Sequence, residues 1–115
     1  MTSSTIDRAT FDELKETAGA EFVVELVDTF LADAPAMLVQ LRQALETRDA
    51  GAFRRTAHSL KSNGNTFGAR GFAEMAKALE LGGMAPVEAA AGAPLADLEN
   101  EYARVSAALE ALKRA

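Results

Sequence analysis

Apolar residues recur every three to four positions along most of the chain, which is the spacing of one face of an α-helix. One such stripe comprises Phe22, Leu26, Phe30, Leu38, Leu41 and Leu45, and another comprises Leu95, Leu98, Tyr102, Val105, Leu109 and Leu112. The strict alternation typical of β-strands is nearly absent, and alanine is abundant. The sequence therefore predicts an all-α protein.

Capping residues and glycines divide the first half of the chain into helices. Thr10 and Glu13 have the spacing of a capping box, so a short first helix is expected to begin at Thr10 and to end at Gly19. The next stripe is interrupted by Pro35, which lacks a backbone donor and clashes with the preceding turn. We expect a kink there, or a break and restart with Asp33 as the new cap.

Capping residues and glycines divide the second half of the chain in the same way. The third helix is expected from the N-cap Asp49 to about residue 65, closed by Gly68, and the fourth from about residue 69 to 81, ended by Gly82 and Gly83. The segment 84–94 reads as a connector with at most one helical turn at 86–90, and the last helix spans about 95–113. Short connections favour antiparallel neighbours, so the expected architecture is an up-and-down antiparallel four-helix bundle with a short extra N-terminal helix.

Composition and charge exclude several classes of function. The chain has 115 residues, which suits a single domain over 1–115, and a formal net charge of -5, which argues against a nucleic-acid binder. It contains no cysteine and one histidine, so thiolate chemistry and a histidine-rich metal site are excluded. The N-terminus MTSSTIDRAT lacks the apolar core of a signal peptide, and no segment approaches the roughly 20 apolar residues of a membrane span. We expect no membrane insertion and a cytoplasmic location.

The single histidine, His58, lies away from the apolar face of its helix. On a wheel of about 100° per residue, it falls about 140° from the centre of the core stripe and therefore points to solvent. Arg54 lies one turn before it, Lys61 and Ser62 lie one turn after it, and Asn65 lies two turns after it. The core stripe itself comprises Phe53, Ala57, Leu60, Gly64 and Phe67.

An exposed imidazole beside cations can accept a phosphoryl group, because its neutral nitrogen is a nucleophile and the cations attract phosphoryl oxygens. The alternative is that His58 is an ordinary surface residue without a specific function, since most exposed polar residues only interact with solvent. The chain has no G-x-S-x-G elbow, no P-loop and no kinase glycine-rich loop. We therefore expect no ATP binding, and a phosphoryl group on His58 would have to come from a partner protein.

The stretch AHSLKSNGNTFGA at 57–69 resembles the signature of histidine-containing phosphotransfer domains of phosphorelays, approximately A-H-x-L-K-G-x-x-x-x-x-G-A. Ala57, His58, Leu60, Lys61, Gly68 and Ala69 match it. The Phe-Leu-x-x-Ala-Pro segment at 30–35 is also similar to one that commonly precedes the histidine helix in this family. The likeness covers one domain, with its core at about residues 6–112.

The resemblance implies that His58 is phosphorylated and that Lys61 helps to hold the phosphoryl group. Ser62 stands where the family often has glycine; serine is small enough for a partner to approach, and its hydroxyl could bond the phosphoryl group. Arg54, Arg55 and Asn65 are candidates for contacts with the phosphoryl group or with a partner protein. The alternative is that they are ordinary solvent-exposed residues of the helix.

The resemblance further implies a phosphocarrier without ATP-dependent kinase activity of its own. Its partners would be receiver domains of response regulators and a hybrid sensor histidine kinase. The chain would bind no cofactor, because the Mg²⁺ ion would sit on the receiver, and it would be a monomer. Two alternatives stay open: a helical protein-interaction module without phosphotransfer, and a small helical hydrolase or ligand-binding bundle.

Overall fold

In the computed structural model, which describes residues 5–114, the chain forms helices and, within that range, no strand. This confirms the all-α prediction. The helices are α1 Arg8–Ala18, α2 Ala20–Thr47, α3 Ala50–Phe67, α4 Arg70–Gly82, α5 Ala85–Ala89 and α6 Ala93–Arg114.

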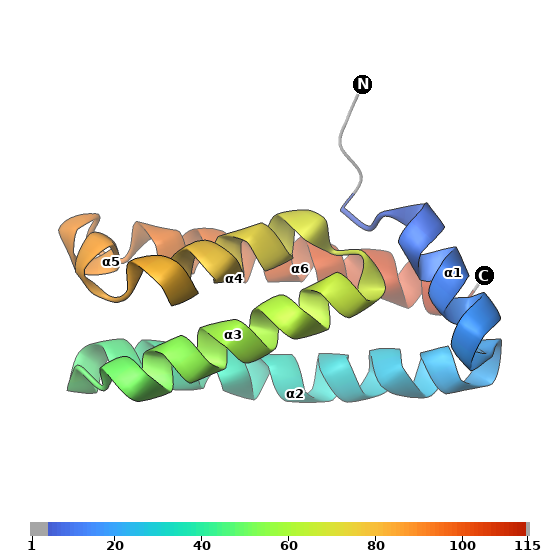
Figure 1. The fold of residues 1–115 in the computed structure, drawn as a ribbon, viewed down its shortest axis with the longest axis horizontal. Helices are drawn as coiled ribbons and strands as arrows, with labels where there is room; N and C mark the ends of the chain where they lie inside the picture. Colours follow the sequence, from blue (N-terminus) through green and yellow to red (C-terminus); the bar gives the residue numbers. More distant parts are fainter. Residues whose placement is uncertain (1–4, 115) are drawn as a thin grey trace, which may run out of the picture.

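The four longer helices α2, α3, α4 and α6 pack in a closed ring. Helix α2 contacts α3 and α6, and α4 contacts the same two helices from the other side. Helix α1 packs across α2 and α3 at one end of the molecule, while the short α5 lies at the other end (Figure 1). The bundle is elongated, with principal extents of 41 × 31 × 19 Å.

An aromatic cluster joins the four helices at the centre of the core. The ring of Phe30 from α2 lies 5.5 Å from that of Phe67 in α3, 6.2 Å from that of Phe72 in α4 and 5.9 Å from that of Tyr102 in α6. Edge-to-face and tilted pairs at these distances add to the free energy gained by burying the rings. One cluster therefore holds together helices that lie far apart in the sequence.

Most helix ends lie where the capping signals place them. The carboxylate of Asp49 accepts a hydrogen bond from the backbone N–H of Ala52 at the start of α3. Gly19, Gly68 and Gly83 follow the last residues of α1, α3 and α4. The predicted connector contains the single short helix α5.

The start of α1 differs from the prediction. The helix begins at Arg8, and its cap is Asp7, whose carboxylate accepts hydrogen bonds from the backbone N–H and the hydroxyl of Thr10. The physical reason is a tertiary contact: the N–H of Asp7 donates to the carbonyl of Gly68 at 2.8 Å, which fixes the backbone just before the helix. Thr10 is therefore an internal residue of α1 and not its cap.

Of the two alternatives predicted at Pro35, the break and restart is wrong, because α2 continues without interruption through this residue, while the kink stays a prediction. Proline leaves the carbonyl four residues earlier, that of Leu31, without a helical donor. The hydroxyl of Tyr102 on α6 donates to that carbonyl at 3.4 Å. Since the helix does not restart, Asp33 caps nothing.

The apolar stripe of α2 is also rotated from its predicted position near the start of the helix. Phe22, predicted to face the core, has 50% of its surface exposed, whereas Val23 and Val27 are buried. Helix α1 packs on α2 and brings Phe11 next to Val23. The position of α1, which periodicity alone does not reveal, therefore decides which residues of α2 face inward.

Candidate functional site

Helix α3 carries the histidine and is joined to α4 by a very tight turn. Gly68 ends α3 with a φ of 81°, in the left-handed region that glycine adopts without strain. A Cβ atom at this position would meet the carbonyl oxygen of Asp7 at 2.9 Å. Glycine is therefore required both for the turn and for the approach of the segment before α1.

Gly64 allows α3 and α4 to pack closely. It is buried on the core face, as predicted, and a Cβ atom here would lie 3.0 Å from the ring of Phe72 and 3.3 Å from the Cβ atom of Ala73. The two helices run in opposite directions from their turn (Figure 1). Residues progressively earlier in α3 therefore lie opposite residues progressively later in α4, and this register brings His58 opposite Glu80.

His58 is exposed, which confirms the helical-wheel prediction, with 56% of its side-chain surface accessible. Its ring is nevertheless anchored. Nδ1 lies 2.8 Å from Oε2 of Glu80, whose side chain is only 16% exposed. The other ring nitrogen, Nε2, lies on the far side of the ring from this contact. The imidazole is therefore held at one edge and free at the other.

The same carboxylate also holds Lys61. The ammonium Nζ of Lys61 donates to Oε1 of Glu80 at 2.8 Å, and the lysine side chain is 24% exposed. The hydrogen bonds from Lys61 and His58 lower the pKa of the Glu80 carboxyl below its usual value. His58 and Lys61, both predicted from the sequence, are thus brought together through a residue that the prediction missed.

Glu80 lies 22 residues after His58 and on another helix, so the spacing within α3 contains no signal for it. The signal that could have identified it is the register of the hairpin. Gly68 closes α3, and counting outward from this turn in both directions places an acidic residue of α4 beside the histidine. This count requires that the two helices pack in contact, which Gly64 makes possible.

The remaining candidate residues, Arg54, Arg55, Ser62 and Asn65, are all exposed on α3. Among the hydrogen bonds within residues 5–114, none joins their side chains to His58. Asn65 lines an open cleft with Thr10, Arg70 and Glu74, farther along the α3–α4 surface. The structure therefore places these residues on the surface around His58 and not in its hydrogen-bond network.

Charge is segregated along the chain. Residues 50–73 contain four cationic residues and no acidic residue, although the whole chain contains 17 acidic and 12 cationic residues. The four are Arg54, Arg55, Lys61 and Arg70. The helix that presents His58 is therefore locally basic in a protein whose net charge is -5. Such a face attracts an anionic partner over distances up to about one Debye length, roughly 8 Å at physiological ionic strength.

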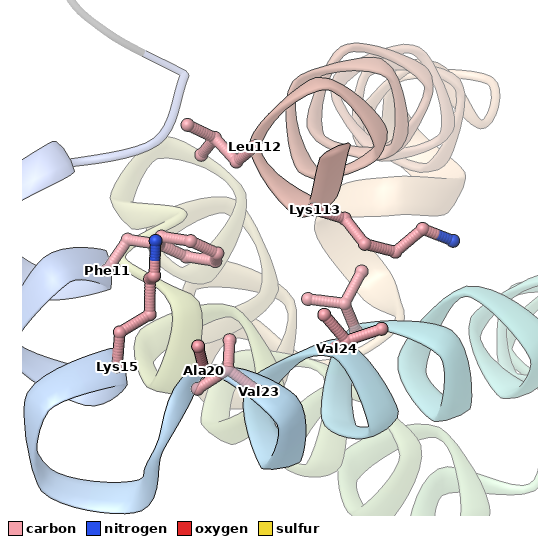
Figure 2. A pocket seen from close by; sticks show the side chains of 8 residues that line it. Phe11, Lys15, Ala20, Val23, Val24, Leu112 and Lys113 are labelled. Carbon is pink, nitrogen blue, oxygen red and sulfur yellow. The ribbon is translucent and has the colours of Figure 1, made fainter. Parts of the chain in front are cut away.

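A small, partly open pocket lies away from these residues. Figure 2 shows it between α1, the beginning of α2 and the end of α6, lined mainly by apolar side chains. Its volume is about 40 Å³, which is too small for an organic substrate.

Within residues 5–114, no three His, Cys, Asp or Glu side chains are grouped so that they could hold a metal ion. In the same range, no helix combines the length and the apolarity that crossing a membrane requires.

Comparison with known proteins agrees with the motif around His58. The model of the Hpt domain family matches residues 25–115. The crystal structure of histidine-containing phosphotransfer protein B from Pseudomonas aeruginosa PAO1 is similar, with a TM-score of 0.85 and 31% sequence identity. That match covers 98% of this chain and 97% of the Pseudomonas chain. A comparison with curated protein sequences finds no match.

Proposed function

The chain belongs to the Hpt domain family, and on this premise we propose that it is a phosphocarrier that accepts a phosphoryl group on His58 and passes it on. The observation that carries the proposal is the geometry of His58, which is the only histidine of the chain. Its side chain is 56% exposed and it lies within the acid-free basic stretch of residues 50–73. An imidazole so placed is accessible to the active site of another protein.

The donor and the acceptor are receiver domains of response regulators, fed by a hybrid sensor histidine kinase. In the transfer, a nitrogen of the neutral His58 ring attacks the phosphorus atom of an aspartyl phosphate. The N–P bond forms, the P–O bond breaks, and the receiver's aspartate leaves as a carboxylate. Phosphoryl transfer needs positioning and charge stabilisation above all, and the rigid bundle supplies the positioning.

Around His58, Lys61 is the residue proposed to stabilise the phosphoryl group. Its ammonium is bound to Glu80, so it has to turn from that carboxylate toward the phosphoryl oxygens. Arg54, Arg55, Ser62 and Asn65 form the exposed surroundings that a receiver would contact. The Mg²⁺ ion that assists the reaction belongs to the receiver, and the chain itself is proposed to bind no cofactor.

The ring of contacts among α2, α3, α4 and α6 supports the up-and-down four-helix bundle as the topology of this carrier. We further propose that the domain acts as a monomer in the cytoplasm, where receiver domains are found.

The test is to incubate the protein with receiver domains phosphorylated by a small-molecule phosphodonor, and to measure acid-labile, alkali-stable phosphate on the chain. Wild type is expected to become labelled, and His58→Gln is expected to remain unlabelled with an unchanged circular dichroism spectrum. Because the chain has one histidine, any phosphohistidine is on His58. Failure of wild type to take label from every receiver encoded in the same genome would overturn the proposal and favour the interaction module.

A further inference from the structure

Helix α4 turns two different sides toward its neighbours. On the side that faces α3, Glu80 contacts His58. On the side that faces α6, Met75 and Ala78 line a groove that is open to solvent. On a helical wheel of about 100° per residue, Ala78 falls about 160° from Glu80. The groove therefore lies on the opposite side of α4 from the histidine.

The groove is mainly apolar and has a closed end. Leu79 from α4 and Val87 from α5 are buried and form its floor, while Ala78 and Pro86 are exposed at its rim. The short α5 contacts both α4 and α6, so it forms a wall at this end of the bundle (Figure 1). The structure thus provides a pocket whose apolar floor is partly accessible from outside.

The size of this pocket favours a side chain of another protein over a free organic ligand. Its volume is about 200 Å³, which is below the range of about 300–1,000 Å³ for pockets that enclose drug-sized ligands. A single large apolar side chain seated in a pocket is a common anchor of protein–protein contacts. Met75 is half-buried at the groove, and its flexible thioether side chain can adapt to the shape of such an anchor.

The apolar surface continues along α4 beyond the groove. Leu81 lies one turn after Ala78, so the two side chains are neighbours on the surface of the helix. Leu81 is 75% exposed, the largest value among the exposed large apolar residues in the described part of the chain. An exposed apolar surface that adjoins a pocket is typical of a site covered by a partner.

Charge indicates the chemistry of the occupant. Residues 71–103 contain six acidic residues and a single cation, Lys77, which is the reverse of the basic stretch 50–73. Asp97 is the acidic residue that lines the groove. It is exposed, and none of the ion pairs within residues 5–114 involves it. An unpaired carboxylate beside an apolar pocket is complementary to a ligand that carries a cation next to an apolar group.

We propose that the groove between α4 and α6 is a docking site for a peptide segment of a partner protein, in which a large apolar side chain fills the pocket and a neighbouring Lys or Arg pairs with Asp97. This site goes beyond the proposed function, because it faces away from His58 and takes no part in the transfer. It gives the domain a second contact surface that stays accessible while a receiver covers the histidine.

The first experiment identifies the chemistry that the groove selects. A phage-displayed library of random short peptides is selected on wild type after depletion on Ala78→Glu, which places a carboxylate at the apolar pocket. Residue 78 is exposed and glutamate is a good helix former, so this variant is expected to fold, as circular dichroism will show. Enriched peptides are expected to share a large apolar residue next to Lys or Arg. No enrichment, or enrichment of peptides without a cation, would overturn the proposal.

The second experiment measures the affinity of a synthetic peptide of the most enriched sequence by fluorescence anisotropy. Ala78→Glu is expected to weaken binding by at least about tenfold, because a charge is placed against apolar groups. Asp97→Asn is expected to weaken it about two- to fivefold, as is typical of an exposed ion pair. The matched controls are Ala32→Glu and Asp33→Asn, which make the same changes at exposed residues of α2 and should bind like wild type. Undiminished binding by Ala78→Glu, or an equal loss in the controls, would contradict the proposed site.

Two further measurements distinguish other uses of the groove. Ala78→Glu is expected to accept phosphate from an isolated receiver at the wild-type rate, and a slower transfer would mean that the groove belongs to the receiver-docking surface and is no separate site. Sedimentation is expected to show the same mass for wild type and Ala78→Glu. A wild-type dimer that Ala78→Glu dissociates would assign the groove to a second copy of the chain and overturn the proposal. If wild type accepts no phosphate at all, the proposed function fails, and the peptide experiments alone decide the docking site.

Discussion

The hydrogen bond between Tyr102 and the backbone of α2 can be tested quantitatively, because proline creates the need for it. Pro35 cannot donate to the carbonyl of Leu31, and the hydroxyl of Tyr102 donates to it at 3.4 Å. Burial raises the pKa of the Tyr102 hydroxyl, so this group stays protonated and able to donate at neutral pH. We predict that Tyr102→Phe destabilises the protein only as long as residue 35 is proline.

The magnitude follows from the geometry. A typical hydrogen bond contributes about 0.5–1.5 kcal/mol net, and a donor–acceptor distance of 3.4 Å is long for a hydroxyl, so Tyr102→Phe should cost about 0.5–1 kcal/mol. The aromatic contacts of the ring with Phe30 and Phe72 are retained in phenylalanine. In Pro35→Ala, the N–H of the new alanine can donate to Leu31, and the cost of Tyr102→Phe should fall below about 0.3 kcal/mol.

The assay is urea unfolding of wild type, the two single variants and the double variant, read by circular dichroism. Pro35→Ala should by itself stabilise the protein by about 1–2 kcal/mol, since the penalty of proline inside a helix exceeds the entropy that proline removes from the unfolded chain. The reasoning would be refuted if Tyr102→Phe cost the same free energy with proline and with alanine at position 35. It would also be refuted if Pro35→Ala were destabilising.

Two further predictions concern packing and pH. Gly64→Ala gains about 1 kcal/mol of helix propensity, but its methyl group would lie 3.0 Å from the ring of Phe72. Overpacking of this kind costs about 1–3 kcal/mol, so the variant should be about 1 kcal/mol less stable than wild type in urea unfolding. In Gly51→Ala on the same helix, the new methyl group comes close only to the far end of the exposed Arg55 side chain, at 3.0 Å, and lies at an ordinary 3.7 Å from Asp49. This change should be neutral or stabilising, and equal effects of the two changes would contradict the packing argument. The hydrogen bonds from Arg42 lower the pKa of the Glu99 carboxyl, so Glu99 should stabilise the fold above about pH 4.3 and lose this contribution as the pH falls through its lowered folded value. As the pH is lowered from about 6 to 2, the melting temperature should therefore fall less steeply in Glu99→Gln than in wild type. Parallel curves for the two proteins would contradict the stabilising role of the Arg42–Glu99 pair.

The parts of the fold that sequence reasoning predicted correctly are those with local causes. Asp49 caps α3 with its own side chain, and Gly68 ends it because only glycine adopts the required φ without strain. The errors occur where contacts between residues far apart in the sequence determine where a helix begins or whether it continues. The cap of α1 shifts to Asp7 because Gly68 binds its backbone, and α2 passes through Pro35 although proline removes a helical donor. Neither effect can be read from the neighbouring residues.

The candidate site divides in the same way. The exposure of His58 follows from the periodicity of one helix, and the structure confirms it. The helical wheel predicts that the imidazole points to solvent, but it does not reveal that the Nδ1 edge of the ring is bound by Glu80. The resemblance implies that Lys61 helps to hold the phosphoryl group, but it does not reveal that the Lys61 ammonium is bound by the same carboxylate. The missing information was the register between α3 and α4, which depends on how closely the two helices approach.

Carrying a phosphoryl group between proteins makes two demands that conflict on a single helix. The reacting nitrogen must be exposed so that another protein can reach it, yet the ring must be held in one orientation. Here α3 provides the exposure, with His58 on its outer face, and α4 provides the orientation through Glu80, which is largely covered. The two are joined by a tight turn at Gly68 and a close contact at Gly64. The site is therefore a property of the paired helices, and residues on the buried side of α3 determine the geometry of the residue on its exposed side.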